Sequence, residues 1–439
     1  MTPSELSLAS EFPAATREQW AALAGDVPAS ATYDGITRAA LYTATGAPPR
    51  SPFVRAPGWW DVRQRHTAAD PEAVLADLEN GVTSLWLAGP AVEALPEVLR
   101  DVYLDLAPVT LDAGAGFTEA AETLLQVHVD KGIPSGEVKG NLGADPLGVR
   151  ARTGAEADLL AAAGLAQYAA ANFPQLRAIV VDALPYHEAG SSDAQELGCS
   201  IAAGVAYLRA LTSAGLEVDA AATQLEFRYA AGVDQFLTIA KFRAARRLWA
   251  RVIEASGGTA AAQRQHAVTS PAMMTRRDPW VNMLRTTVAC FAAGAGGADA
   301  ITVLPFDSAA GQPDAFGRRI ARNTQSILLE ESTVAGVLDP AGGSWYVERL
   351  SDDLARAAWS WFTEIERAGG LLAALDSGLI PARLAETWSA REENIAAGTD
   401  PVTGVTAFPN PAETPLVRPP APEPPSGGLP RVRYAEEFE

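Results

Sequence analysis

Two of the four histidines stand at or near the ends of segments that read as β-strands. His187 follows directly on residues of AIVVDALPY, which starts at Ala178, and His266 lies inside RQHAVTS, which starts at Arg264. Where parallel strands end together, an imidazole can donate a hydrogen bond to a substrate carbonyl or transfer a proton. A buried histidine satisfied by its neighbours is the alternative, and the sequence leaves both interpretations open.

The segment TQLEFRY, starting at Thr223, carries two charged residues on one face of an expected strand. Side chains alternate along a strand, so Glu226 and Arg228 share one face, while Leu225 and Phe227 share the other. Helices cover the outside of a parallel barrel, so the charged face should point into its interior. Unpaired charges there would cost roughly several kcal/mol each. We therefore predict a polar network that plugs the barrel, with a functional ion-pair site as the alternative.

Metal binding is not indicated by the spacing of possible ligands. The two cysteines, Cys199 and Cys290, lack CxxC spacing, and the sequence contains no HExxH. Structural and catalytic metal sites need such clustered donors. We therefore expect no metal centre and no disulfide framework in this chain.

Short β-rich segments alternate with longer amphipathic helices from about residue 83 onward. Asp234, Asp193 and the pair Asp278-Pro279 are typical of helix starts. The alternation predicts parallel βα units, and about eight of them favour a (β/α)8 TIM barrel over an open doubly wound sheet. The expected strands are TSLWLA, VYLDLAPVT, GEVKGNL, AIVVDALPY, TQLEFRY, RQHAVTS, DAITVLPF and a weaker eighth around VLDPAGGSWYV.

Both flanks depart from this alternation. Residues 1–70 include PPRSPFVRAPGWWDVRQRH, which reads as an extended arm that packs on a partner or on the barrel; a partly ordered leader is the alternative. The barrel is expected over residues 71–375. Residues 376–439 should form a C-terminal helix and a proline-rich linker, a type of segment that ordinarily leads to another domain.

The net charge of −19 argues against a nucleic-acid or anionic-membrane partner, because such partners attract clustered lysine and arginine. No stretch reaches the length of about 18 apolar residues that a membrane span needs. The N-terminal sequence has no basic region followed by an apolar core, so it does not predict a secretory signal. We expect a cytoplasmic protein.

Several long motifs resemble the barrel domain of the methylmalonyl-CoA mutase family. They are YHEAGSSDAQEL, AKFRAARRLWARV, HAVTS, RDPWVNMLRTT, RIARNTQSILLEES and LDPAGGSWYVE, and the likeness extends from about Thr37 to TDPVTGVTAFPN near residue 410. The resemblance implies a (β/α)8 barrel whose axial tunnel takes the pantetheine of coenzyme A. It also implies adenosylcobalamin chemistry that interconverts methylmalonyl-CoA and succinyl-CoA, with a separate cobalamin domain reached through a linker.

The sequence departs from the catalytic members of that family at the residues that face the substrate. Arg65 stands where they carry a tyrosine, Val268 where they carry a glutamine, and Glu226 and Arg228 where they carry a serine and a phenylalanine. The stretch from Asn141 shows nothing like their substrate-carboxylate arginine. The cobalamin-ligating DxHxxG motif is absent, because proline stands two residues before the histidine of HEAG. The histidines at 187 and 266 match the family pattern.

These losses resemble the small, non-catalytic subunit of the bacterial heterodimeric mutase. The leading hypothesis is such a subunit, which holds a large catalytic subunit that binds the adenosylcobalamin and the acyl-CoA, while a following cobalamin-type domain is absent here. The alternative is a catalytic acyl-CoA mutase barrel that works with a cobalamin domain on a separate chain, with His187 polarising the thioester. An unrelated barrel enzyme, such as a lyase, is the third hypothesis.

Overall fold

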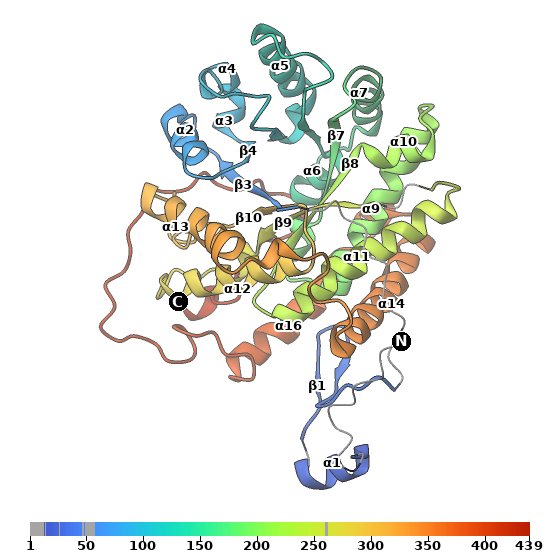
Figure 1. Ribbon diagram of the computed structural model, residues 1–439, viewed down its shortest axis with the longest axis vertical. Helices are drawn as coiled ribbons and strands as arrows, with labels where there is room; N and C mark the ends of the chain where they lie inside the picture. The colour runs from blue at the N-terminus through green and yellow to red at the C-terminus, as the bar shows by residue number, and fades with distance from the viewer. Residues whose placement is uncertain (1–12, 14, 26, 46–47, 49–57, 260–261) are drawn as a thin grey trace, which may run out of the picture.

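The computed structural model describes residues 13, 15–25, 27–45, 48, 58–259 and 262–439. At its centre eight strands close into a barrel in the order β10-β3-β4-β5-β6-β7-β8-β9, as predicted (Figure 1). Every neighbouring pair in the barrel is parallel. The strands are β3 (Asp61–His66), β4 (Ser84–Ala88), β5 (Val109–Asp112), β6 (Gly140–Ala144), β7 (Leu176–Asp182), β8 (Leu225–Ala231), β9 (Arg264–Thr269) and β10 (Ala300–Thr302).

Helices surround the barrel and continue on both sides of it in the chain (Figure 1). The helices that follow barrel strands in the chain are α2 (Pro71–Glu79), α3 (Pro90–Glu93), α4 (Leu95–Val98), α5 (Phe117–Asp130), α6 (Pro146–Thr153), α7 (Leu159–Asn172), α8 (Leu184–Glu188), α9 (Asp193–Ser213), α10 (Val218–Thr223), α11 (Gln235–Ala255), α12 (Val281–Ala295) and α13 (Ala315–Ser326). Outside them lie α1 (Arg17–Ala24), α14 (Trp345–Arg367), α15 (Leu371–Asp376) and α16 (Leu379–Ala396). Among the described residues, no helix is long and apolar enough to cross a membrane.

The apolar face of β8 points outward, as the alternation of its side chains predicts. Phe227 packs on Trp249 of α11 with ring centroids 4.7 Å apart, and Tyr229 meets Phe242 of the same helix at 6.0 Å. All four of these aromatic rings are fully buried. Burying side chains of this size is the main favourable term that holds α11 against the sheet. The opposite face of β8 is thereby directed into the barrel.

The eighth strand was predicted in the wrong place. The segment around VLDPAGGSWYV contains turns and then the start of α14 at Trp345, and no strand. The barrel is instead closed by β3, which the sequence had placed in the N-terminal arm. Trp60, next to it, is buried and donates from Nε1 to Gln325 at 2.9 Å. The barrel therefore begins before residue 71.

Helix starts were predicted with mixed success. Asp234 is the N-cap of α11 and accepts from the N–H of Leu237, as expected. The capping box of α9 is formed by Ser192 with Gln195, one residue before the predicted Asp193, whose carboxylate is paired elsewhere. Asp278 has a positive φ of 43° and lies before α12, which begins only at Val281.

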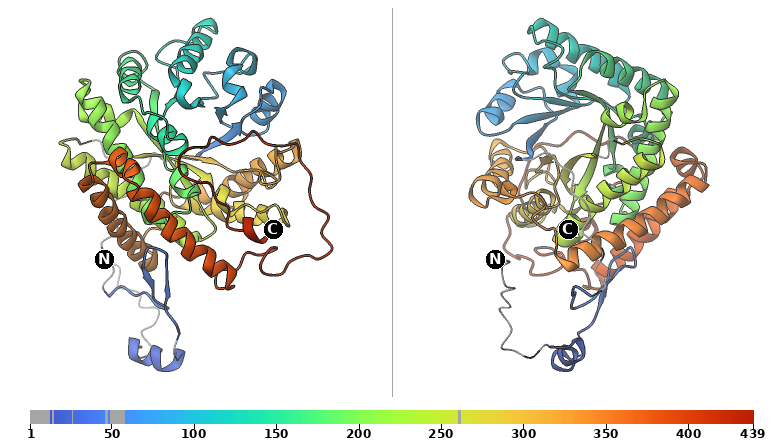
Figure 2. Two further views of the ribbon diagram at one scale, coloured as in Figure 1. Left: turned by 180° about the vertical axis from the view of Figure 1, so that it is seen from behind. Right: turned by 45° about the vertical axis from the view of Figure 1, so that its right-hand side comes forward.

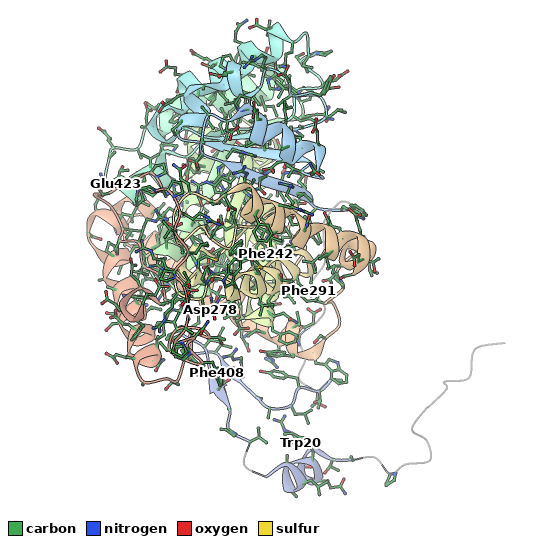
Figure 3. All side chains as sticks on the ribbon, turned by 90° about the vertical axis from the view of Figure 1, so that its left-hand side faces the viewer. Trp20, Phe242, Asp278, Phe291, Phe408 and Glu423 are labelled. Carbon is green, nitrogen blue, oxygen red and sulfur yellow. The ribbon has the colours of Figure 1, made fainter. Side chains whose placement is uncertain are left out.

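The described part of the N-terminal arm carries α1 and a small antiparallel hairpin, β1 (Ser30–Ala31) and β2 (Thr37–Arg38). Figure 3 shows Trp20 of α1 well away from the barrel. Arg38 of the hairpin donates to Asp234 at 2.6 Å, and Ile36, between the two strands, is buried in the main core. Most of the arm sequence PPRSPFVRAPG lies outside the described residues.

The chain returns to the barrel after α16. Figures 1 and 2 show it leaving as a wide loop and ending beside the barrel. We call residues 427–439 the C-terminal segment. Val432 donates its N–H to Glu188 O at 2.8 Å, and Tyr434 donates to Ala272 O at 2.8 Å. Glu188 ends α8, and Ala272 follows β9, so the C-terminal segment lies against the end of the barrel where the strands finish.

Candidate functional site

The first inward position of β8 carries a buried ion-pair cluster. Glu226 accepts from Arg63 at 2.6 Å and from Arg264 at 3.1 Å, and the Glu226 and Arg63 side chains are each 3% exposed. Strands β3 and β8 are not neighbours, because β9 and β10 lie between them. The pair between Arg63 and Glu226 therefore spans the interior of the barrel instead of running along its wall.

The pKa of Glu226 reflects two opposing influences. Burial alone raises it, but the guanidiniums of Arg63 and Arg264 outweigh burial and hold the pKa well below its ordinary value. Glu226 is thus a carboxylate in the folded protein at neutral pH. Such a buried charge is tolerated because both of its oxygens have a cationic partner.

The next inward position of β8 fills the barrel at a second level. Arg228 donates to Asp182 of β7 at 2.9 Å, and its guanidinium carbon lies 4.1 Å from the ring centroid of Trp86. Strands β4 and β8 stand opposite each other in the ring of eight, so this cation–π contact crosses the barrel axis. Arg228 and Trp86 are each 2% exposed. At this level protein atoms are in contact from wall to wall.

His266 belongs to the same interior layer. Its Nδ1 accepts from Arg228 Nε at 3.2 Å, so the ring proton is on Nε2, which donates to Thr302 Oγ1 at 2.8 Å. Burial, and then the guanidiniums of Arg63 and Arg228, lower the pKa of His266 well below its ordinary value. His266 is therefore a neutral, fully satisfied histidine, which was the alternative that the sequence left open.

The two remaining departures from the catalytic pattern lie nearer the mouth. Val268 is buried in a small apolar cluster with Trp86, Leu184 and Ala230, inside the barrel. Arg65 is exposed to solvent, and its guanidinium carbon lies 4.6 Å from the Trp86 ring. Position 268 therefore carries an apolar side chain in place of the glutamine of the catalytic pattern. Position 65 carries a cation beside Trp86 in place of a tyrosine.

His187 is held from both sides at the start of the mouth. Its Nε2 lies 2.6 Å from Ser270 Oγ, and its Nδ1 lies 3.4 Å from Glu196 Oε2. Glu196 is also bound by Lys241, whose Nζ lies 2.7 Å from Oε2 and 2.7 Å from Asp193. His187 contacts Ser270 and His266 contacts Thr302, so the two histidines do not contact each other within the described structure.

Neither histidine fits the role of a cobalamin ligand. Both ring nitrogens of His187 and of His266 have protein partners within the described structure. The other two histidines are His66, which faces Asp77 of α2 at 3.3 Å, and His128, whose Nδ1 lies 2.9 Å from Leu124 O within α5. The described residues also contain no group of three or more candidate metal ligands. Neither His187 nor His266 therefore has a ring nitrogen left to bind cobalt.

Sequence reasoning missed most partners of the two predicted interior charges. Arg63 lay in the segment assigned to the arm, and Asp182 was hidden in an apolar run. Trp86 lies in SLWLA, where every residue is buried, so no alternation marks it as inward-facing. Ser270 and Glu196 carry no local signal, because they meet His187 only through the fold.

Comparison with known proteins agrees with this architecture. A family model described as methylmalonyl-CoA mutase matches residues 66–423. The methylmalonyl-CoA mutase small subunit of Streptomyces virginiae is 58% identical, over 99% of this chain and 77% of the relative. The small subunit of Propionibacterium freudenreichii subsp. shermanii is 38% identical, over 100% of this chain and 76% of the relative. The large subunit of Porphyromonas gingivalis matches less of the chain, with 35% identity over 58% of it and 36% of the relative.

The fold and the extent of the family match define the class: the chain belongs to the methylmalonyl-CoA mutase family. Within that family it groups with the small subunits, which it matches over nearly its whole length. The recognition made from the sequence motifs is confirmed, as is the barrel.

Proposed function

We propose that this chain is the non-catalytic partner in a methylmalonyl-CoA mutase, in which a large subunit binds the adenosylcobalamin and isomerises the acyl-CoA. The small-subunit names of its relatives support the assignment to the complex. The existence of relatives named large subunit supports a heterodimer. A cytoplasmic location stays a prediction.

The observation that carries the non-catalytic role is the filled interior. In a barrel that threads pantetheine along its axis, the inward side chains must leave a continuous passage. Here Arg63 and Glu226 meet across the axis at 2.6 Å, and Arg228 and Trp86 meet at 4.1 Å. Both separations are direct contacts, so an acyl chain cannot pass between the groups without breaking them.

The charges make this filling costly to displace. Removing one member of a buried pair leaves the other uncompensated, at about 3–5 kcal/mol. An entering thioester offers no charge to replace Glu226 beside Arg63 and Arg264. The interior contacts therefore act as a plug rather than as a flexible lining.

The N-terminal arm is proposed as part of the surface that holds the large subunit. Its hairpin is bound to the body of this chain, because Ile36 is buried in the main core and Arg38 pairs with Asp234 at 2.6 Å. The helix α1 before the hairpin, in contrast, buries none of its residues. Leu23 of α1 is 90% exposed. A helix that projects from its own barrel and exposes an apolar side chain is suited to pack on a second subunit.

Two measurements test the non-catalytic role. The purified chain with adenosylcobalamin should not convert methylmalonyl-CoA to succinyl-CoA, whereas the complex with its large subunit should. Acetyl-pantetheine, which carries no phosphate, should give no saturable heat with this chain in isothermal titration, with the large subunit as the positive control. Turnover by the isolated chain, or saturable binding of acetyl-pantetheine to it, would show an open tunnel and refute the proposal.

A further inference from the structure

Two buried hydrogen-bond donors without acceptors and one solvent-exposed guanidinium lie around a single indole ring near the mouth. Trp86 Nε1 and Arg228 Nη2 are buried and have no hydrogen-bond partner among the described residues. Arg65, whose guanidinium lies on the same ring, forms no ion pair or hydrogen bond within the described part of the chain. A buried donor left unpaired costs about 1–3 kcal/mol, so the two buried donors, gathered beside a cation, call for an acceptor.

The charges around these donors do not balance. The guanidiniums of Arg65, Arg152 and Arg228 face the carboxylates of Asp112 and Asp182. Arg152 and Arg228 both pair with Asp182, at 2.5 and 2.9 Å, and Arg228 lies 3.8 Å from Asp112. A third carboxyl, Asp145, also acts on Arg152, but burial and then Asp182 raise its pKa to about 7. Three cations therefore face two carboxylates and a third carboxyl that is only partly ionised at neutral pH.

Glu188 does not remove this excess, because its carboxylate pairs with Arg431 of the C-terminal segment at 2.6 Å. The surplus charge is therefore carried by Arg65.

We propose that the mouth of this barrel binds one small anion, a carboxylate or a phosphate group, on Arg65 with the N–H donors of Trp86 and Arg228 beneath it. Arg65 is the solvent-exposed member of the three, so it is the group that an entering anion meets first. Its long side chain can turn away from the indole and uncover the donors below. Guanidinium groups suit this task because they offer paired donors in a fixed plane to two oxygens at once.

The site uses Trp86 and Arg228, the residues of the closing contact nearer the mouth, so an anion bound there would stop at that contact. Such a site needs no open tunnel and goes beyond the subunit role. It would take the acidic end of a ligand and not the length of an acyl-CoA. Anion binding here and exclusion of acetyl-pantetheine from the axis are separate properties of the same molecule. Either can fail without the other.

Isothermal titration of the full chain at low ionic strength tests the site, with succinate and inorganic phosphate as separate probes. We expect saturable binding of at least one probe with one site per chain. Arg65→Gln should weaken it by about tenfold or more, because a charge-assisted hydrogen-bond pair is lost. Arg319→Gln is the matched control, since Arg319 is an exposed arginine on α13, away from the mouth. It should change the affinity by less than about twofold.

Two further variants separate charge from geometry. Arg65→Lys keeps the charge but not the planar pair of donors, so it should recover part of the lost affinity. Trp86→Phe keeps a ring and removes the N–H donor, so it should bind more weakly than the unmodified chain. The absence of saturable binding by both probes would overturn the site. Equal losses in Arg65→Gln and Arg319→Gln would also overturn it, because they would place the anion on the general surface.

Discussion

Replacing Glu226 by glutamine removes the charge that holds two arginines inside the barrel and changes the side-chain volume little. In the folded chain Glu226 is 3% exposed and binds Arg63 at 2.6 Å and Arg264 at 3.1 Å. After the substitution Arg264 still has the carboxylate of Asp61 at 3.0 Å, whereas Arg63 has the same carboxylate only at 3.9 Å. The loss of one member of a buried pair costs about 3–5 kcal/mol. Because Arg264 retains a partner, we expect a loss near the lower end, about 3 kcal/mol.

The effect should depend on pH in a defined direction. The folded pKa of Glu226 is depressed by the two guanidiniums in spite of burial. A depressed carboxyl pKa stabilises the fold above the unfolded value of about 4.3, and this contribution is lost as pH falls below it toward the folded value. The difference between the unmodified chain and Glu226→Gln should therefore be constant from about pH 7 to 5 and then shrink.

Urea unfolding followed by circular dichroism at pH 7 and at about pH 4 measures both parts of this prediction. Glu254→Gln is the control, because Glu254 forms an equally short pair with Arg251 at 2.7 Å but both side chains are more than half exposed. A surface pair of this kind contributes about 0–1 kcal/mol. If Glu226→Gln loses no more stability than Glu254→Gln at pH 7, the interior pair is not the strong contact described here.

Three other changes probe the interior and the C-terminal segment. Trp86→Ala removes the ring beneath two guanidiniums, and urea unfolding should show a loss of about 3–5 kcal/mol; a loss below about 1 kcal/mol would contradict the packing. Arg391→Ala removes a guanidinium that lies 4.2 Å from the Tyr33 ring and 4.8 Å from the Tyr434 ring. Amide exchange in the C-terminal segment should then quicken by about threefold or more, and unchanged exchange would show that the segment is held without it. His266 is neutral in the folded chain, because burial and then Arg63 and Arg228 lower its pKa well below its ordinary value. Its ring signals should therefore not shift between about pH 8 and 5.5, and a shift would contradict the neutral state.

The sequence predicted the charged interior of the barrel because β8 alternates cleanly. Leu225, Phe227 and Tyr229 form one apolar face, and Glu226 and Arg228 form the other. A helix that covers an apolar face leaves the charged face only one direction, which is inward. The same local clarity made Asp234 recognisable as a helix cap.

Strand β3 escaped prediction because neither of its faces is apolar. Arg63 points inward to Glu226, and Gln64 and His66 are buried beneath the helices, where His66 meets Asp77 of α2. Arg63 is tolerated because Glu226, 163 residues further along the chain, pairs with it. Periodicity of hydrophobic residues cannot detect a strand of this kind, because the partners are supplied only by the fold.

The interior is closed by two contacts that do not depend on each other. Glu226 is held by charge, through Arg63 and Arg264, whereas Arg228 is held by Asp182 and by the face of Trp86. Their positions are two residues apart on β8, so they close successive levels of the same axis. A substitution that opens one level leaves the other in contact. Passage along the axis would therefore require both levels to change, which is why a single substitution toward the catalytic pattern is not expected to restore a tunnel.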